Sequence, residues 1–114
     1  MRRALWLGLA LLCFQPAAYA ADAARGKLIA EVRCTPCHHL DSTTFQVGPG
    51  LLDIYGKKPT ISGVPFRHWD AEALDAWLAN PRGIKPNTKM SIPRISKTDR
   101  ADLIAFFKSQ SARN

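Results

Sequence analysis

The sequence lacks the features that many classes of protein require. It shows no internal repeat, no low-complexity tract and no strand-like alternation of apolar and polar residues. Its longest apolar run, Ala4 to Phe14, is too short for a transmembrane helix, which needs about 18 residues. The 114 residues suffice for one domain. These absences predict a small all-α domain with no stable membrane insertion.

Acidic residues are also scarce. The chain has 16 Lys and Arg against 9 Asp and Glu, a formal net charge of +7. Because the basic residues are scattered rather than clustered, we expect no nucleic acid as a partner. A positive surface of this kind suits protein partners with acidic docking faces.

The first twenty residues differ in pattern from the rest. Two arginines precede the apolar run, and Ala18-Tyr19-Ala20 has the small-x-small pattern that signal peptidase cuts after. A buried N-terminal helix is the alternative, and Pro16 disfavours it. We predict a signal peptide over residues 1–20, cleaved after its last residue, and a periplasmic domain over residues 21–114. Cleavage lowers the formal net charge to +5, because it removes the two arginines.

Cysteine is rare as well. Cys13 lies in the predicted signal peptide, and the two leucines before it do not fit a lipoprotein anchor, so we expect it to be discarded. Cys34 and Cys37 then remain as the only thiols of the exported domain. Such a pair ordinarily forms a disulfide in an oxidising compartment. The residue that follows the pair predicts a different chemistry.

Cys34-Thr35-Pro36-Cys37-His38 is the attachment pattern of c-type haem. Thiols at i and i+3 of a helical turn project to the same side, about 5–6 Å apart at Cβ. Both can therefore reach the vinyl groups along one edge of a porphyrin and form thioethers. His38 is then held beneath the iron as an axial ligand. We predict one covalently attached haem c, with its iron, per chain.

Two other sites share the C-x-x-C spacing. A thioredoxin-like dithiol requires a strand and an α/β fold, which this pattern does not predict. A zinc site requires two further ligands, and only His39 and His68 are available, with no second C-x-x-C. Haem attachment is the favoured interpretation.

Met90 is the candidate for the second axial ligand. Apart from Met1 it is the only methionine, and it lies in a loop bounded by prolines. A lone methionine often fills a core, but a thioether downstream of the haem motif is placed to favour ferrous iron and raise its potential. His68 is the rival ligand.

Capping residues and apolar spacing predict three helices. They run from Asp22 to about Arg33, from Asp70 through Leu78, and onward from Ser96. The apolar faces are expected at Ala24, Leu28, Ile29, Val32, Leu74, Trp77, Leu78, Leu103, Ile104, Phe106 and Phe107. Residues 41–63 and 82–94 are rich in Gly, Pro and polar residues, so both segments are expected to be loops.

Further segments occur in a recognisable order. They are Gly26, Gly48-Pro49-Gly50-Leu51, Trp69, Trp77-Leu78-Ala79-Asn80-Pro81, Pro86-Asn87-Thr88-Lys89-Met90 and residues 100–108. With the haem motif, this set resembles the class I c-type cytochromes of the short mitochondrial and bacterial type, over essentially all of residues 21–114. The resemblance implies a cytochrome c fold, with three to four short helices wrapped around one covalent haem. It also implies an electron carrier rather than an enzyme.

The resemblance assigns roles to single residues. The carbonyl of Pro49 would accept from the His38 ring, Trp69 would donate to a haem propionate, and Thr88 would belong to the haem environment. Trp77 would face the methionine side of the haem, and Gly26 would lie where the first helix crosses the last.

The chain also departs from the family pattern. Asn87 replaces a glycine, and we expect it to tolerate positive φ in that turn. Ala30 replaces an aromatic residue, a gap that Phe106 and Phe107 can fill. The segment of residues 58–69 is short, which leaves the lower haem edge more open.

The predicted function is single-electron transfer by a soluble monomer between respiratory or dehydrogenase partners. A membrane oxidase, a quinol-oxidising complex or a dehydrogenase would be the partner, steered by a basic ring around the haem edge. That ring would comprise Arg33, Lys57, Arg82, Lys85 and Lys89. Two alternatives stay open: a permanent cytochrome subunit of a periplasmic dehydrogenase, and a haem enzyme or gas sensor with a displaceable sixth ligand.

Overall fold

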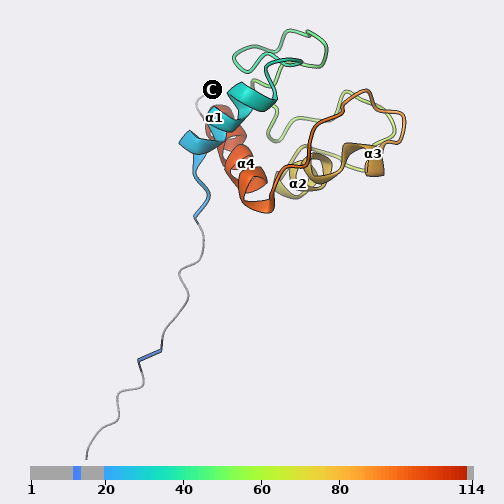
Figure 1. The fold of residues 1–114 in the computed structure, drawn as a ribbon. Helices are drawn as coiled ribbons and strands as arrows, with labels where there is room; N and C mark the ends of the chain where they lie inside the picture. Colours follow the sequence, from blue (N-terminus) through green and yellow to red (C-terminus); the bar gives the residue numbers. More distant parts are fainter. Residues whose placement is uncertain (1–11, 14–19, 113–114) are drawn as a thin grey trace, which may run out of the picture.

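The computed structural model describes residues 12–13 and 20–112, and over this part of the chain the secondary structure is helical with no strand. Four helices follow in order: α1 (Ala23–Arg33), α2 (Ala71–Ala79), α3 (Pro81–Ile84) and α4 (Lys97–Ser111) (Figure 1). The predicted all-α class is therefore confirmed. Most of the predicted signal peptide lies outside the described residues. None of the described helices combines the length and apolar character needed to cross a membrane.

The three expected helices begin where their caps predicted. The Asp22 side chain accepts from the backbone N–H of Arg25 at 3.0 Å, and the Asp70 side chain accepts from that of Ala73 at 2.8 Å. Ser96 caps α4 in the same way. Each capping side chain accepts from a backbone N–H that has no partner within the helix. This hydrogen bond stabilises the helix by about 1 kcal/mol. These starts depend on local chemistry, and the sequence therefore predicts them well.

The core forms where α1 crosses α4. A Cβ at Gly26 would overlap the backbone carbonyl oxygen of Asp102, so only glycine allows this approach. Next to the crossing, Ala30 and Leu103 are fully buried. Figure 1 shows α1 and α4 side by side, and the loop of residues 34–50 continues directly from the end of α1. The crossing therefore fixes the haem motif on the rest of the core.

Replacing Gly26 by Ala is expected to lower the free energy of unfolding by roughly 3 kcal/mol, the upper end for an overpacked core. The added methyl group would push the backbones of α1 and α4 apart, since the contacted atom is a carbonyl oxygen with little freedom to move. Guanidinium unfolding of the haem-loaded protein, followed by far-ultraviolet circular dichroism, measures the loss. The control Ala24→Ser, exposed on the same helix, should change stability by about 0.5 kcal/mol at most. Equal effects of the two substitutions would contradict the close crossing.

The predicted apolar face of α1 is largely wrong. Leu28 and Val32 are 63% and 75% exposed, Ala24 is exposed as well, and only Ile29 packs partly against the core. The reason is the short distance between the two helices: the inward face carries small residues at Gly26 and Ala30. The large apolar residues therefore point outward.

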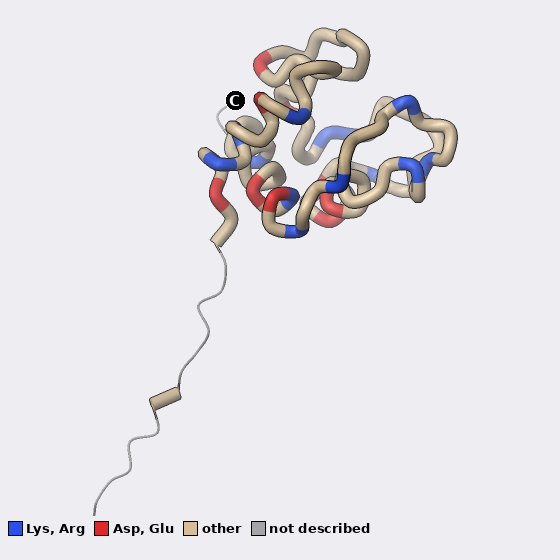
Figure 2. Tube along the Cα trace, in the orientation of Figure 1, with Lys and Arg blue, Asp and Glu red and all other residues tan. Residues whose placement is uncertain are grey.

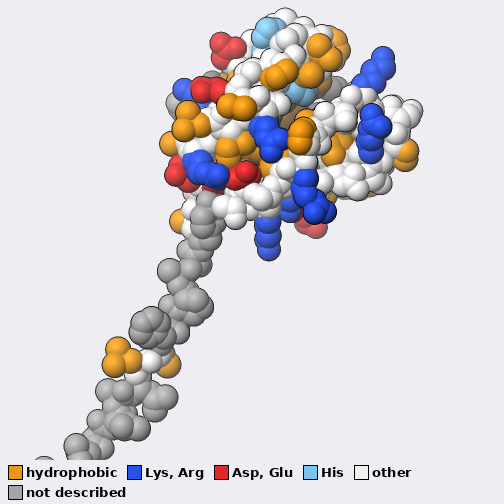
Figure 3. All heavy atoms as spheres, viewed as in Figure 1, with side chains coloured by type: hydrophobic (Ala, Val, Ile, Leu, Met, Phe, Trp, Pro, Cys, Tyr) orange, Lys and Arg blue, Asp and Glu red, His pale blue; other side chains and the backbone are white. Residues whose placement is uncertain are grey.

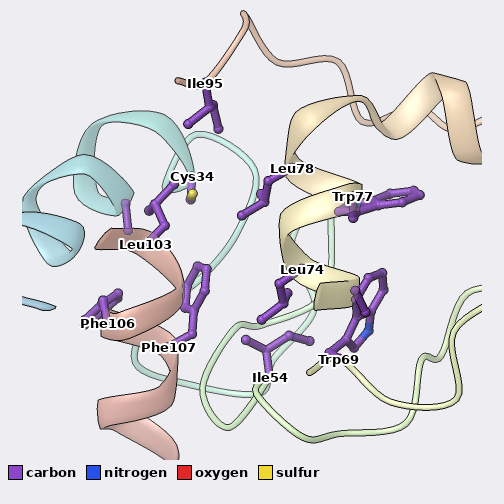
Figure 4. Close-up of a cluster of buried hydrophobic side chains, with 12 residues drawn as sticks. Cys34, Ile54, Trp69, Leu74, Trp77, Leu78, Ile95, Leu103, Phe106 and Phe107 are labelled. Carbon is purple, nitrogen blue, oxygen red and sulfur yellow. The ribbon is translucent and has the colours of Figure 1, made fainter. Parts of the chain in front are cut away.

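The predicted core positions of α2 and α4 are confirmed. Figure 4 shows their side chains converging on one cluster, in which Ile104 is partly buried and the others are buried. The buried members are Leu74, Trp77, Leu78, Leu103, Phe106 and Phe107. The two phenylalanine rings lie 5.6 Å apart between centroids. These two rings of α4 thus supply the aromatic bulk that the family pattern has at the position of Ala30.

The loops differ from expectation at two points. Residues 41–63 contain no helix, as predicted, but α3 begins the segment that was expected to be a loop from residue 82. The Asn80 side chain accepts from the backbone N–H of Gly83 at 3.0 Å, and Pro81 occupies the first turn, where its missing N–H costs nothing. These two local features suffice to form one helical turn.

Asn87 does not need the positive φ that we expected of it. Among the non-glycine residues that the structure describes, only Asp53 has a positive φ. The turn at Asn87 is closed instead by a hydrogen bond from the Thr88 N–H to the Lys85 carbonyl at 2.9 Å. With proline at its second position, such a turn suits ordinary backbone angles. Replacement of the family glycine is therefore accommodated without strain.

Candidate functional site

The haem motif continues the helical path of α1. The N–H of Cys34 donates to the Ala30 carbonyl at 2.8 Å, and the N–H groups of Cys37 and His38 donate to the Cys34 carbonyl at 3.1 and 2.8 Å. The two thiols therefore share one helical turn, as their spacing predicted. Cys34 is buried, Cys37 is exposed, and both are free thiols.

The two thiols differ in environment. Burial raises the pKa of the Cys34 thiol to about 11, although the positive charge of Arg33 opposes this rise. In the haem-free domain Cys34 therefore stays protonated at neutral pH and packs as an apolar group. Its sulfur points into the cluster that Figure 4 shows between α1, α2 and α4.

The ring of His38 is oriented by the loop that follows it. Its Nδ1 lies 2.6 Å from the Pro49 carbonyl oxygen, so this nitrogen carries the proton and donates. A Cβ at Gly48 would overlap the ring, which shows how closely the loop packs beneath it. The lone pair of the neutral imidazole is then left on Nε2. This is the arrangement that a metal-ligating histidine requires.

Met90 is held by two separate contacts. Its N–H donates to the Thr88 hydroxyl oxygen at 3.2 Å, and its Sδ accepts from the indole N–H of Trp77 at 3.2 Å. Trp77 is buried on α2, so the sulfur is tied to the core rather than left on the surface. Sequence reasoning placed Trp77 on the methionine side but did not foresee this hydrogen bond.

Trp69 is buried at the edge of the same cluster. Its ring lies 5.7 Å from that of Trp77 and 5.5 Å from that of Phe66, measured between centroids. Among the residues that the structure describes, its indole N–H has no hydrogen-bond partner, which leaves it free for a carboxylate. The rival ligand His68 is exposed beside it, as is His39 beside the haem motif.

The apolar side chains around these groups fit a flat apolar cofactor. Many of them pack against the buried cluster but retain exposed surface, which is costly unless something covers it. They include Leu51, Tyr55, Ile61, Val64, Phe66, Ile84, Met90 and Ile92. Figure 3 shows hydrophobic side chains in the hollow between the upper loop and the loops on the right. The lone pair on Nε2 and the Met90 thioether are a pair of donors suited to haem iron, and the two free thiols are suited to thioether bonds with the porphyrin.

The residues of the predicted basic ring lie at or near the surface. Figure 2 shows Lys and Arg positions at the end of α1 and along the loops on the right. Of the predicted ring, Arg82 and Lys89 are exposed, and Arg33, Lys57 and Lys85 are partly exposed. The ring is therefore accessible to a partner.

A groove of about 640 Å³ lies elsewhere, between α1, α4 and the residues after the haem motif. Of the predicted site residues only His38 lines it, and neither Met90 nor a tryptophan does. It is therefore not the haem site.

A cluster of charged residues joins the start of α1 to α4, and the sequence did not predict it. The buried Asp102 of α4 accepts from the backbone N–H of Asp22 at 2.8 Å and from Arg25 Nη1 at 2.6 Å. Asp102, and then Asp99, raise the pKa of the Arg25 guanidinium above its ordinary value through hydrogen bonds. The pairing joins residues 77 and 80 positions apart, and no local pattern reveals it.

The fold and this arrangement define a class I c-type haem domain. Comparison with known proteins agrees: the family model described as cytochrome c matches residues 23–111. Cytochrome c 2.1 of Caenorhabditis elegans is 35% identical over 105 residues, covering 83% of this chain and 95% of that protein. Cytochrome c of Euglena viridis is 35% identical over 98 residues, covering 77% and 96%.

The chain belongs to the cytochrome c family. It is an electron carrier that holds one covalently attached haem c with its iron, and it is not an enzyme.

Proposed function

We propose that Cys34 and Cys37 carry the haem through thioethers and that His38 and Met90 are the axial ligands of its iron. The observation that carries this proposal is the position of the Met90 sulfur, which accepts from the indole of the buried Trp77. A methionine that only filled space would not need a directed donor at its sulfur. The bound haem supplies a reversible one-electron change at the iron.

The protein residues limit the reorganisation that accompanies this one-electron change, because they hold the axial ligands in fixed positions. Pro49 fixes the tautomer and the orientation of His38, and Thr88 and Trp77 hold Met90 from its backbone and its sulfur. We propose that Trp69 donates its indole N–H to a haem propionate. Because these contacts hold both ligands in place, little has to move when an electron arrives or leaves.

We further propose export and cleavage of residues 1–20 after Ala20, with function in the periplasm. The basic, apolar and small-residue sequence of this segment supports cleavage. So does the position of Asp22, which caps α1 and donates its backbone N–H to Asp102. The first anchored residue of the domain thus lies just beyond the proposed cleavage site.

The partners we propose are redox proteins with acidic docking faces, and the carrier would act as a monomer. An oxidase, a quinol-oxidising complex or a dehydrogenase would meet this description. The exposed Arg82 and Lys89 and the net positive charge support electrostatic steering of such a partner. A carrier that stays bound to one dehydrogenase would share these features and would purify as a stable complex.

The test is carbon monoxide binding to the reduced, haem-loaded protein at neutral pH. With Met90 fixed on the iron, the Soret spectrum is expected to stay unchanged over hours of exposure. The variant Met90→Ala serves as the positive control, because it opens the sixth position and should bind carbon monoxide. Tight binding by the unsubstituted protein would support a gas sensor or haem enzyme and contradict the carrier with a fixed sixth ligand.

A further inference from the structure

We propose that Gln110, in the last turn of α4, is a positioning residue for the axial ligand His38. It acts through the Leu40 carbonyl, by which it attaches the segment after His38 to the helix. The inference rests on the proposed function, since it concerns how the proposed iron ligand is held.

One hydrogen bond joins the end of α4 to the segment that carries His38. The Gln110 Nε2 donates to the Leu40 carbonyl oxygen at 3.2 Å, between residues 70 positions apart. The carbonyl oxygen of His39, which lies between His38 and Leu40, accepts from the Leu51 N–H at 2.8 Å. The backbone next to His38 is therefore held from two directions, by the loop that follows it and by α4.

The loop that follows His38 is closed at its base. A Cβ at Gly50 would overlap the Ser42 carbonyl oxygen, so the two arms of the loop pack backbone against backbone. Pro49, whose carbonyl oxygen accepts from the His38 ring, directly precedes Gly50. A shift of the first arm away from α4 would therefore also displace the acceptor of the ring.

The end of α4 is itself fixed. Leu103, Phe106 and Phe107 are buried, and Figure 4 shows Phe107 turned into the buried cluster. The last turn of a helix often frays, but here the Ser111 hydroxyl donates to the Tyr55 carbonyl oxygen at 3.3 Å. The helix end can thus serve as a fixed point for the loop.

The groove of about 640 Å³ described above lies at this contact. His38, Leu40 and Gln110 all line it, together with residues of α1. The groove keeps the segment after His38 apart from the helices over much of this side. The hydrogen bond from Gln110 joins the two sides of the groove and so fixes their separation.

The same hydrogen bond is a weak source of stability. A carbonyl oxygen can only accept, so the amide nitrogen of Gln110 faces Leu40 and Oε1 faces elsewhere. Oε1 is buried and has no hydrogen-bond partner among the residues that the structure describes. An unpaired buried acceptor costs at least as much as one hydrogen bond contributes. The main effect of the amide is therefore to position Leu40.

The position of the loop affects the iron through His38. The hydrogen bond from its Nδ1 to Pro49 increases the basicity of the ring, and a more basic ligand stabilises ferric iron. Loss of the contact at Leu40 weakens this hydrogen bond, so the midpoint potential rises. General loosening of the haem pocket would have the opposite sign, because water stabilises the more highly charged ferric state.

The experiment compares Gln110→Leu with the unsubstituted, haem-loaded protein. Leucine is similar in size but removes both the donor and the unpaired buried acceptor. We expect the equilibrium constant for reduction to rise roughly threefold, which is about 30 mV at 59 mV per tenfold. In NMR spectra of the reduced protein, the His38 Nδ1 proton should exchange with solvent about tenfold faster.

Two further variants isolate the donor. Gln110→Glu keeps the length of the side chain and removes the N–H groups, so exchange of the His38 Nδ1 proton should again be faster. Gln46→Leu is the matched control, because Gln46 is exposed in the same loop and donates to the Pro36 carbonyl at 3.4 Å rather than linking to α4. Its potential and exchange rate should equal those of the unsubstituted protein.

An unchanged exchange rate in Gln110→Leu or Gln110→Glu would overturn the positioning role. So would a fall in the potential of Gln110→Leu, which would indicate general loosening, or an equal acceleration of exchange in Gln46→Leu. In each case attached haem and a persistent sulfur-ligation band in the ferric spectrum would leave the proposed function intact. NMR spectra of the unsubstituted protein without an iron-bound His38 would instead contradict the proposed function.

Discussion

Replacing Met90 by Ala is expected to lower the midpoint potential by roughly 0.1–0.3 V, part of the ~0.8 V range that axial ligands span. A thioether favours ferrous iron, so its loss leaves the ferric state relatively more stable. The weak ferric absorbance at about 695 nm that reports sulfur ligation should disappear as well. Redox titration and the ferric spectrum measure both effects on the same sample.

The comparison variant is Trp77→Phe, which keeps an aromatic ring on α2 but removes the donor to the Met90 sulfur. Its potential should shift by much less than that of Met90→Ala, and its long-wavelength band should persist with altered intensity. Persistence of that band in Met90→Ala would show that another residue ligates the iron. The exposed His68 would not explain such a band, because it has no sulfur.

The double substitution Cys34→Ala/Cys37→Ala is expected to abolish covalent haem attachment and to reduce the yield of folded, haem-loaded protein more than about tenfold. Small domains lack enough core to fold without a staple or cofactor. Here many apolar side chains pack against the buried cluster but stay partly exposed, and a bound haem would bury them further. Haem-stained denaturing gels and circular dichroism measure attachment and folding separately.

The single substitutions provide the control for that prediction. Cys34→Ala and Cys37→Ala each leave one thioether, so each should retain pigment on a denaturing gel. Cys34→Ala should be the less stable of the two, because Cys34 is buried in the core and Cys37 is exposed. Loss of all attached pigment in either single variant, or its retention in the double variant, would contradict the assignment of two thioethers.

Local chemistry made much of the fold predictable. Asp22, Asp70 and Ser96 each cap a helix through a side chain that acts within three residues. The spacing of the thiols and His38 likewise depends only on one helical turn. The contact between His38 and Pro49 was implied by resemblance alone, since no rule of spacing joins positions 11 residues apart.

The face of α1 was not predictable in the same way. Apolar periodicity assumes that large side chains turn inward, but the contact between Gly26 and the Asp102 backbone brings α4 too close for them. The exposed Leu28 and Val32 are the consequence. Contacts between residues far apart in the sequence determine this exposure, as they determine the hydrogen bond between Asp102 and Asp22. The helical turn α3 was not predicted, because the glycine and prolines that follow Asn80 favour a loop more strongly than its capping side chain favours a helix.

The most direct test of the account is the mass of the purified chain after denaturation and extraction with acidified acetone. The account predicts a single species that begins at Ala21, remains coloured and is heavier than the polypeptide by one haem. A colourless chain of polypeptide mass, with the pigment in the acetone, would contradict covalent attachment at Cys34 and Cys37 and with it the proposed site.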